Sequence, residues 1–424
     1  MKKAIVVGTG AGGATVAKEL QGRFDVTILE AGKEFHPFTQ LSMVETIRKT
    51  GLLFDEREIQ LVFPTYKIRR AGDGMVLVNG VGLGGTTTLC TGNALRMDDD
   101  LKALGFDLDA EFAEIAREIP ISTAHQRRWH KSTRRLFEIF GEMGLDPRPT
   151  PKMGDYDRCI SCGRCVLGCP QGAKWDSRRF LNIALAHGAE LVSSCRVARV
   201  VVQDGRATGV EARRGLARRF YPADLVILAA GGLGTPVILD ASGIECEPSL
   251  FVDPVLCVAA NIPGSRLNRE IPMPFVSQRE GFILSPYFDY LSYFFNRAWR
   301  APAGDIAAIM IKLADSNRGS ILARGLDKGL TAEDKSRLQE AVKLCTEILV
   351  RYGASAERTF LGTLNAGHPG GMLPLTAAER ETLHSARLPA NLYVADATLI
   401  PKSLGNPPIL TIIALAKRVS KVVQ

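Results

Sequence analysis

The sequence contains no run of eighteen apolar residues, so it predicts no helix that spans a membrane. Aromatic residues make up only 7% of the 424 residues, and the chain has six histidines. It shows no low-complexity segment and no internal repeat, which excludes a disordered chain and a repeat array. The hydrophobic content of 46% is enough for large cores, and the length predicts two domains.

The formal net charge of +8 makes the chain moderately basic. Basic residues gather on one predicted helix and shortly after it, at Arg127, Arg128, Lys131, Arg134, Arg135, Arg178 and Arg179. A solvated helix face explains such a run, and the alternative is a docking surface for an acidic electron carrier or an anionic lipid. A peripheral membrane contact therefore stays open. No nucleic-acid-binding motif accompanies the charge, so we expect no nucleic acid partner.

The chain opens directly with an apolar strand pattern, so we expect no signal peptide and a cytoplasmic location. In that compartment, cysteines serve as free thiols or metal ligands more often than as disulfides. The nine cysteines of this sequence are therefore candidates for metal binding.

Residues 4–30 carry the most informative pattern, which is an apolar strand, a glycine turn, a helix and a second strand that ends at Glu30. Gly8 allows the tight turn, Gly10 lets backbone N–H groups approach a pyrophosphate, and Gly13 lets helix and strand pack closely. The helix N-terminus favours the phosphate charge. Glu30 stands at the distance from the turn at which a carboxylate accepts hydrogen bonds from an adenosine ribose. The pattern predicts a dinucleotide site, and an ordinary glycine turn is the alternative.

A second glycine-rich stretch, NGVGLGGTTTLCTGN, spans residues 79–93. Its bare backbone and its threonine hydroxyls suit close approach to a flat ring or a phosphate. The other predicted elements are strands at 60–63, 190–192, 197–202, 224–229 and 392–395, and helices at 124–144, 331–352 and from 409. We expect the strands between 190 and 229 to extend a parallel sheet. Thr331 can cap the helix at 331–352, and Cys345 lies on its apolar stripe.

Residues 282–299 hold eight aromatic residues, far above the average for the chain. Three interpretations stay open for this stretch. It can be buried strand core, an apolar wall of a substrate site, or a loop that touches a membrane.

Four stretches resemble one family and follow its order along the whole chain. They are Val7–Gly13 with Glu30-Ala31-Gly32, Gly82–Thr87 ending at Asn93, Leu228–Leu239 with Ser242-Gly-Ile244, and Val394–Thr398 with Pro401, Gly405-Asn406-Pro407 and Thr411–Arg418. Together they resemble the glucose–methanol–choline (GMC) family of FAD-dependent oxidoreductases. The C-terminal motif is most similar to the cholesterol oxidase branch of that family.

The resemblance implies an α/β fold in which a discontinuous, Rossmann-like FAD-binding domain is joined to an α+β substrate domain that covers the flavin. We place the FAD-binding domain at 1–250, the substrate domain at 251–375, and the return to the FAD-binding domain at 376–424. The resemblance also implies FAD-binding roles for particular residues. Gly8, Gly10, Gly13 and Glu30 would hold the ADP half, Gly84, Gly85 and Asn93 would lie along the pyrophosphate and isoalloxazine, Val197 would reach the adenine through its backbone, and Asp396 would bind the ribityl or pyrophosphate region.

Cys159, Cys162, Cys165 and Cys169-Pro170 form a C-x2-C-x2-C-x3-C-P run, which is the spacing of bacterial ferredoxins. Within 155–176, these thiolates can wrap the corners of a 4Fe–4S cluster, and the intervening glycines permit tight turns. Zinc is the alternative, although its sites normally use two separated cysteine pairs. In two-cluster ferredoxins the cysteine before proline serves the other cluster, so the fourth ligand is either Cys169 or a cysteine elsewhere in the chain. The possible substitutes are Cys90, Cys195, Cys246 and Cys257.

His368 lies in a Gly-His-Pro-Gly-Gly loop, and Asn406 lies just before the last helix. Both resemble the paired residues of the family at the substrate face of the flavin. A neutral histidine can accept the hydroxyl proton of an alcohol, and an asparagine can donate a hydrogen bond to its oxygen. We therefore expect His368 and Asn406 to form the catalytic pair.

These patterns predict a dehydrogenase that oxidises an apolar or lipid-like alcohol by hydride transfer to flavin. Electrons would leave through the cluster to ferredoxin or another carrier, and the reaction could run in the reductive direction on a carbonyl. Two alternatives stay open: an electron-transfer subunit of a larger complex, and a redox-neutral flavoenzyme.

Overall fold

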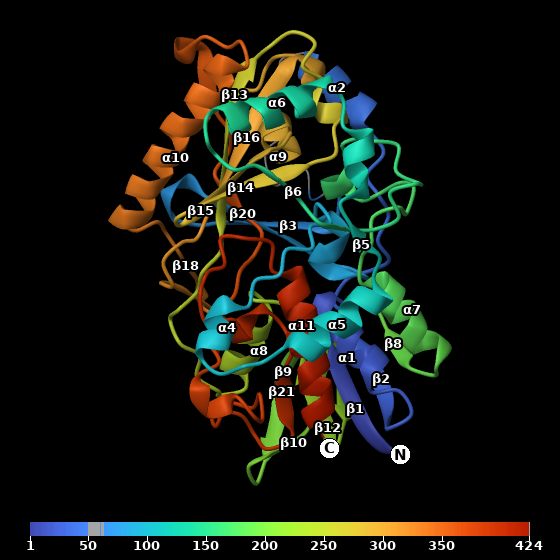
Figure 1. Cartoon of the computed structure of the whole chain (residues 1–424). Coiled ribbons are helices and arrows are strands. Elements are labelled where there is room, and N and C mark those ends of the chain that lie inside the picture. Colours follow the sequence, from blue (N-terminus) through green and yellow to red (C-terminus); the bar gives the residue numbers. More distant parts are fainter. Residues whose placement is uncertain (50–59, 61–62, 424) are drawn as a thin grey trace.

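The computed structural model describes residues 1–49, 60 and 63–423. The predicted strand at 60–63 falls partly on residues 61–62, which lie outside the described residues. In Figure 1 the chain forms two stacked parts, and both termini lie at the end of the lower part. Strands and helices alternate in this lower part, which confirms the predicted mixed α/β fold with Rossmann-like parallel strands.

The lower part is built on a parallel sheet of five strands. Their order is β21 (Leu392–Val394), β12 (Leu225–Leu228), β1 (Lys2–Val7), β2 (Phe24–Leu29) and β8 (Glu190–Val192). Strand β12 is buried at every position, because helices cover both faces of a parallel sheet. Helix α1 (Ala11–Glu19) packs against α11 (Ile409–Val422) and α7 (Arg178–Ala186). The predicted strand–turn–helix–strand unit of residues 4–30 is therefore confirmed.

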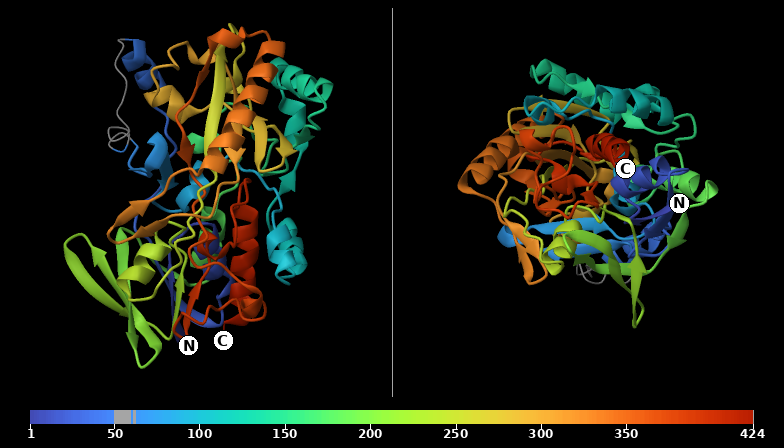
Figure 2. Two further views of the ribbon diagram at one scale, coloured as in Figure 1. Left: turned by 90° about the vertical axis from the view of Figure 1, so that its left-hand side faces the viewer. Right: turned by 90° about the horizontal axis from the view of Figure 1, so that it is seen from below.

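One predicted strand does not belong to this sheet. Residues 197–202 lie in β9 (Cys195–Gln203), which pairs antiparallel with β10 (Arg206–Arg214), and β10 pairs with β11 (Ala217–Pro222). These three strands form a sheet of their own, and Figure 2 shows the green ribbon extending away from the body. The expectation of a continuous parallel sheet was wrong here, because strand pattern alone does not specify the partner.

The upper part holds a larger, mostly antiparallel sheet. Its strands, in order, are β3 (Tyr66–Arg70), β4 (Val76–Gly80), β20 (Asn365–Ala366), β13 (Pro254–Asn261), β16 (Ile306–Leu313), β15 (Phe282–Pro286), β14 (Phe275–Arg279) and β6 (Arg148–Pro149), and β19 (Thr359–Leu361) also pairs with β13. Strand β16 is buried along its whole length. Its alternate residues belong to two different apolar clusters, so this sheet is covered on both faces.

One face of the large sheet packs against α10 (Ala332–Arg351), and α10 also contacts α6 (Lys131–Glu142). The predicted capping of α10 is confirmed, because the Thr331 hydroxyl accepts from Asp334 N and the Asp334 carboxylate accepts from Thr331 N. Cys345 is fully buried on this helix, as its position on the apolar stripe predicts.

The predicted helix at 124–144 is interrupted in the structure. Residues Ala124–Arg128 form a 3-10 turn, Trp129 is extended, and the α-helix α6 begins at Lys131. The remaining described helices and short strands are α2 (Leu41–Lys49), α4 (Asp99–Ala103), α5 (Asp109–Glu118), α8 (Thr235–Ala241), α9 (Tyr290–Phe295), β5 (Ile121–Ser122), β7 (Lys152–Met153), β17 (Ser320–Leu322) and β18 (Gly325–Asp327). Within the described ranges, no helix is both long and apolar enough to cross a bilayer.

The aromatic stretch 282–299 forms β15, α9 and the segment after them. Its rings are largely buried, and Phe288 packs against both Tyr293 and Trp299. Burial of this kind fits the core interpretation and leaves little aromatic surface for a membrane contact.

The predicted domain boundaries at 250 and 375 stay a proposal. Strands β3, β4 and β6 precede residue 250 and still belong to the large sheet. The chain therefore passes between the two parts more often than three consecutive ranges suggest.

Candidate active site

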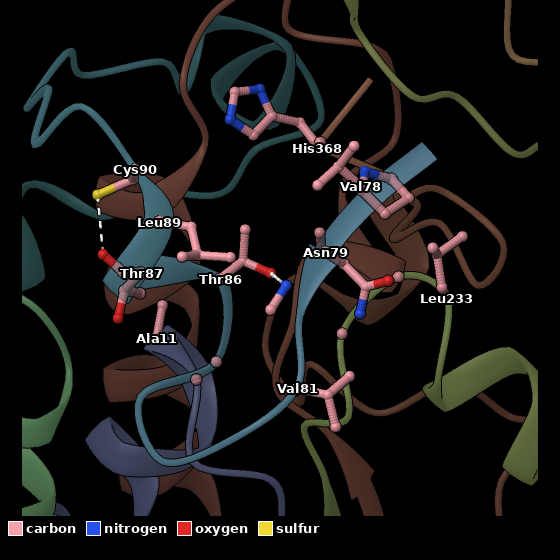
Figure 3. Close-up of a pocket in the computed structure, with 18 of the residues that line it drawn as sticks. Ala11, Val78, Asn79, Val81, Thr86, Thr87, Leu89, Cys90, Leu233 and His368 are labelled. Carbon is pink, nitrogen blue, oxygen red and sulfur yellow. Dashed lines mark hydrogen bonds between the residues drawn. The ribbon is translucent and has the colours of Figure 1, made fainter. Parts of the chain in front are cut away.

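A cavity of about 520 Å³ lies between the parallel sheet and the large sheet. Its wall includes the glycine turn after β1, the residue 79–93 stretch, parts of β9 and β16, and the loop that carries His368. Figure 3 shows Ala11 at the start of α1, the short turn that carries Thr86, Thr87 and Leu89, and His368 beyond that turn. The cavity thus joins the predicted dinucleotide site to the predicted catalytic loop.

The three glycines of the first turn occupy different positions. Gly8 has φ +102°, and a Cβ at Gly13 would lie 2.0 Å from the Gly8 carbonyl oxygen, so both positions need glycine for the fold itself. At Gly10 a Cβ would meet no atom within 4 Å. Gly10 lines the cavity as the N-cap of α1, and no side chain caps the N–H groups that follow. This open helix N-terminus fits the negative charge of a pyrophosphate.

Glu30 is 5% exposed and lines the cavity beside this turn. One carboxylate oxygen accepts from the Thr9 N–H at 3.0 Å and the Thr9 hydroxyl at 2.7 Å, and the other accepts from Gly32 N–H at 2.8 Å. Burial raises the pKa of Glu30, while these hydrogen bonds oppose the shift. Glu30 therefore holds the turn in shape, and its remaining lone pairs can accept from ribose hydroxyls.

The residue 79–93 stretch packs directly on the first turn. Gly84 N–H donates to the Thr9 hydroxyl at 3.1 Å, and a Cβ on Gly85 would lie 3.1 Å from Gly10. Gly85 and Asn93 line the cavity, whereas Gly84 lies behind them. Asn93 accepts a hydrogen bond from the buried ammonium of Lys152.

Val197 and Asp396 also line the cavity. Asp396 accepts from Gly231 N–H at 2.9 Å and from the Thr235 hydroxyl at 2.5 Å through one oxygen, and from Thr398 N–H at 2.9 Å through the other. Burial raises the pKa of Asp396. The carboxylate thus acts as a cap of the following 3-10 turn while one side of the residue faces the cavity.

The predicted catalytic pair is only partly assembled. His368 lines the cavity, but Asn406 does not, although Pro407 and Pro408 do. The Asn406 side chain is 4% exposed and exchanges hydrogen bonds with Gln278, at 3.0 Å from Gln278 Nε2 and 3.3 Å to Gln278 Oε1.

Asp253 and Lys312 are site residues that the sequence patterns did not identify. The Asp253 side chain is fully buried, and its Oδ1 accepts from the Ser403 hydroxyl at 2.5 Å and Gly405 N–H at 3.2 Å. Its Oδ2 accepts from Lys312 Nζ at 2.7 Å and lies 3.6 Å from Nδ1 of His368. One carboxylate therefore lies beside His368 and accepts from Gly405, the residue before Asn406. The available signal was Lys312 itself, the only charged residue in an otherwise apolar strand.

The charges of this group depend on one another. Burial by itself would raise the pKa of Asp253, but Lys312 and His368 outweigh that effect and lower it. Burial lowers the pKa of Lys312, and Asp253 opposes the shift. Each group therefore stabilises the charged form of the other in the interior.

Burial lowers the pKa of His368 to about 4, the charge of Lys312 adds to this effect, and Asp253 opposes it. The imidazole is therefore neutral at pH 7. Its side chain is 23% exposed, and since it lines the cavity, water there offsets part of the desolvation. A ligand that expels this water strengthens the preference for the neutral ring.

Aromatic and apolar side chains form much of the remaining wall, among them Tyr66, Tyr287, Tyr290, Leu291 and Met310. Asp289 lies among them, is 2% exposed, and caps α9 through Leu291 N–H. Burial raises the pKa of Asp289 to about 6. Tyr287 and Tyr290 of the 282–299 stretch therefore line the cavity and also pack in the apolar core, so the core and apolar-wall interpretations of this stretch are compatible.

A second, small pocket is lined by all four cysteines of the C-x2-C-x2-C-x3-C run. The four thiols are half-buried, and Ile160 beside them is 60% exposed. Gly163 has φ +69°, and a Cβ there would lie 2.1 Å from the Asn268 carbonyl oxygen, so the turn between the cysteines needs glycine. Across the part of the chain that the structure describes, no three His, Cys, Asp or Glu side chains are arranged as a formed metal-ion site. The four cysteines line one pocket, and their ligand role stays a proposal.

The small pocket and the large cavity are neighbours. Val166, directly after Cys165, lines the large cavity, and its carbonyl oxygen accepts a hydrogen bond from the Tyr66 hydroxyl at 2.5 Å. Successive residues of the 3-10 turn Cys165–Leu167 thus line the two pockets.

Comparison with known proteins identifies the family. The family model for GMC oxidoreductase matches residues 3–261. An uncharacterized protein of Methanocaldococcus jannaschii is 28% identical over 427 residues, which cover 97% of each chain. An uncharacterized GMC-type oxidoreductase of Mycobacterium tuberculosis is 31% identical over 279 residues, which cover 62% of this chain and 42% of the relative. Pyridoxine 4-oxidase from Mesorbium loti has the same fold, with a TM-score of 0.72, 15% identity and 99% coverage of both chains.

The chain therefore belongs to the GMC oxidoreductase family. It is an FAD-dependent oxidoreductase that acts on CH–OH groups. The open space at Gly10 and the uncapped start of α1 fit the pyrophosphate of FAD.

Proposed function

We propose that this enzyme oxidises the alcohol group of an apolar small molecule, with His368 accepting the hydroxyl proton. The observation that carries the proposal is that His368 lines the same cavity as the glycine turn Gly8–Gly10, so the proton acceptor and the cofactor site share one space. Bound FAD supplies the hydride acceptor. The neutral ring of His368 has a free lone pair at pH 7, which a proton acceptor requires.

The family resemblance, together with the lining of the cavity, supports the set of residues proposed to hold FAD. The open helix start at Gly10 would receive the pyrophosphate, Glu30 would receive the adenosine ribose, and Val197 would reach the adenine through its backbone. Gly85 and Asn93 would lie along the pyrophosphate and the isoalloxazine, and Asp396 would bind the ribityl or pyrophosphate region. Gly8, Gly13 and Gly84 act through the backbone shape that they permit.

For Asn406 we propose an orienting role toward the alcohol oxygen. This role requires its amide to exchange Gln278 for the substrate, because the amide is paired with Gln278 in the structure. The apolar nature of the substrate rests on the wall formed by Tyr66, Tyr287 and Met310.

We further propose one 4Fe–4S cluster held by Cys159, Cys162, Cys165 and Cys169. Support comes from the ferredoxin spacing and from the single pocket that the four side chains line. In addition, Ser161 N–H lies 3.4 Å from Cys159 Sγ, the kind of N–H to sulfur contact that tunes cluster potentials. When bound, the cluster supplies a one-electron route toward a soluble carrier such as ferredoxin.

The arginines that the sequence suggested as a docking surface divide into two groups. Arg128 donates to the carbonyl oxygens of Tyr156 and Asp157, so it lies against the cysteine segment. Arg135 instead pairs with Glu138 and Glu142 on α6, which compensates its charge. Arg127 is likewise paired, with Asp157 at 3.2 Å. We therefore propose Arg128, beside the cysteine pocket, as the contact for an acidic electron carrier.

The test is anaerobic purification followed by analysis of flavin, iron and acid-labile sulfide. The expected result is one FAD and about four irons and four sulfides per chain. Replacing Cys162 by serine should remove the iron and leave FAD bound, because Cys162 does not line the large cavity. Stoichiometric zinc without sulfide would reject the cluster and leave the alcohol oxidation untouched.

The reaction itself is tested by screening alcohols for anaerobic bleaching of the flavin. Bleaching by an apolar alcohol supports the dehydrogenase. An electron-transfer subunit would show no bleaching by any alcohol, and a redox-neutral flavoenzyme would turn over without an electron acceptor. A carbonyl substrate reduced by prereduced enzyme would establish the reverse direction.

A further inference from the structure

The geometry points to Asp253 as the positioning residue that sets which nitrogen of His368 faces the substrate. The inference rests on the proposed role of His368 as proton acceptor and adds a group that the family assignment does not supply. It concerns the tautomer of the imidazole, which decides whether a lone pair or an N–H points into the cavity.

The first observation is the position of Nδ1. This nitrogen is buried and has no hydrogen-bond partner, and the carboxylate of Asp253 lies 3.6 Å away. A well-formed hydrogen bond would be a few tenths of an ångström shorter. Hydrogen bonds of catalytic groups are commonly long before substrate binds and tighten afterwards. An N–H on Nδ1 therefore has its natural acceptor in Asp253, which leaves the lone pair on Nε2.

The second observation is that three donors surround the carboxylate of Asp253. Lys312 Nζ, the Ser403 hydroxyl and Gly405 N–H all point hydrogen toward the carboxylate. These contacts fix the carboxylate on both oxygens and keep it ionised in a fully buried place. A fixed, ionised acceptor beside Nδ1 favours the Nδ1–H tautomer over the Nε2–H tautomer.

The same contacts tie the two predicted catalytic residues together. Gly405 directly precedes Asn406, and its N–H lies on one oxygen of Asp253 while His368 lies beside the other. Asp253 therefore sets the separation between the His368 loop and the Asn406 loop. Its neighbour Asp315 also accepts from Ser403 but pairs with Lys328.

The experiment uses the FAD-loaded protein labelled with ¹⁵N-histidine and reads the tautomer of His368 by NMR at pH 7, without substrate. The resonance is assigned with the His368→Gln protein. The expected wild-type signal is Nδ1–H with an unprotonated Nε2. In the wild type, donors occupy both carboxylate oxygens of Asp253, whereas the amide in Asp253→Asn has only one acceptor oxygen. The tautomer ratio of His368 should therefore shift about tenfold or more toward Nε2–H. Asp315→Asn is the matched control, since it removes a buried charge from the same network and should leave the tautomer unchanged.

A wild-type signal from the Nε2–H tautomer, or an unchanged signal in Asp253→Asn, overturns the inference. If Asp253→Asn fails to fold, the Asp253→Asn/Lys312→Met protein removes the unpaired cation and is read in the same way. Failure of the proposed function is distinguishable, because it shows as an unaltered rate of flavin bleaching in His368→Gln whatever the tautomer is.

Discussion

Lys312 and Asp253 form an ion pair of 2.7 Å, and their side chains are 1% and 0% exposed. The pair lies where the large sheet borders the cavity, and Nδ1 of His368 lies 3.6 Å from the Asp253 carboxylate. Each charge of a buried ion pair is stabilised by the opposite charge of the other. Replacing one member should therefore change the pKa of an adjacent group such as His368.

Replacing Lys312 by methionine should raise the pKa of His368 above about 4, because the cation that helps to depress it is removed while Asp253 remains. The unpaired Asp253 should also lower the free energy of unfolding by about 3–5 kcal/mol. An NMR titration of ¹³C-labelled histidine measures the first effect and thermal unfolding the second. Lys328→Met is the control, since it leaves the buried Asp315 unpaired. It should destabilise the fold without moving the His368 titration, and a similar shift in both variants would contradict the assignment.

His368→Ala should slow anaerobic reduction of the flavin by roughly 10²–10⁴-fold, with FAD and iron contents unchanged, because the proton acceptor is lost. Stopped-flow absorbance with an alcohol identified by the bleaching screen gives the rate. Replacing the exposed His36 by alanine serves as the control. A rate near that of the wild type would remove histidine from the mechanism and favour the electron-transfer subunit.

Gly10→Val and Gly13→Val should fail in different ways. A side chain at Gly10 meets open space in the protein, so this variant should fold but occupy the pyrophosphate position and lose FAD. A side chain at Gly13 would overlap the Gly8 carbonyl, so this variant should be destabilised as a whole. Flavin absorbance and the melting temperature separate the two outcomes. Full FAD content in Gly10→Val would place the pyrophosphate elsewhere.

Stability should fall as the pH is lowered from about 6.5 to about 4, because of His125. Its ring is fully buried, accepts from Trp129 Nε1–H at Nδ1, and donates from Nε2 to the Thr150 carbonyl oxygen. Burial lowers its pKa to about 4, and the charge of Lys152 adds to the shift. The unfolded chain takes up the proton near pH 6.5, whereas the folded chain does so only near pH 4. The stability present above pH 6.5 is therefore lost over this interval.

The loss amounts to about 3 kcal/mol for a shift of this size. Melting temperatures between pH 7 and pH 4.5 measure it, and His368 adds to the same slope because its pKa is lowered too. In His125→Gln the slope should become shallower, and in His36→Gln it should persist. An equal slope in wild type and His125→Gln would show that other groups dominate.

The local elements of the cofactor site could be predicted because each depends on a short pattern. The strand, turn and helix around Gly8–Gly13 need only neighbouring residues, and Glu30 ends the next strand of the same unit. The Asp253–Lys312 pair could not be predicted, because it depends on the register of β13 against β16, in which Val255 lies opposite Lys312. Residues 59 positions apart meet only after that register is set.

The cysteine pocket could be predicted only in part. Their spacing predicts that the side chains converge, and they do line one pocket. The spacing carries no information on where that pocket lies, and its position against the cavity depends on the packing of Val166 and Tyr66. For Asn406 the sequence motif predicts a catalytic role but carries no information on the pairing of its amide with Gln278, which comes from β14.

In the 3-10 turn Cys165–Leu167, Cys165 lines the small cysteine pocket and Val166 lines the large cavity. Whatever coupling this shared wall transmits between ligands on its two sides is reciprocal. Any factor by which FAD raises the affinity of the thiols for iron must equal the factor by which iron raises the affinity of the cavity for FAD. Dialysis of the protein against a chelator, followed by flavin absorbance, therefore measures this coupling, and full retention of the flavin would show that the two sites bind independently.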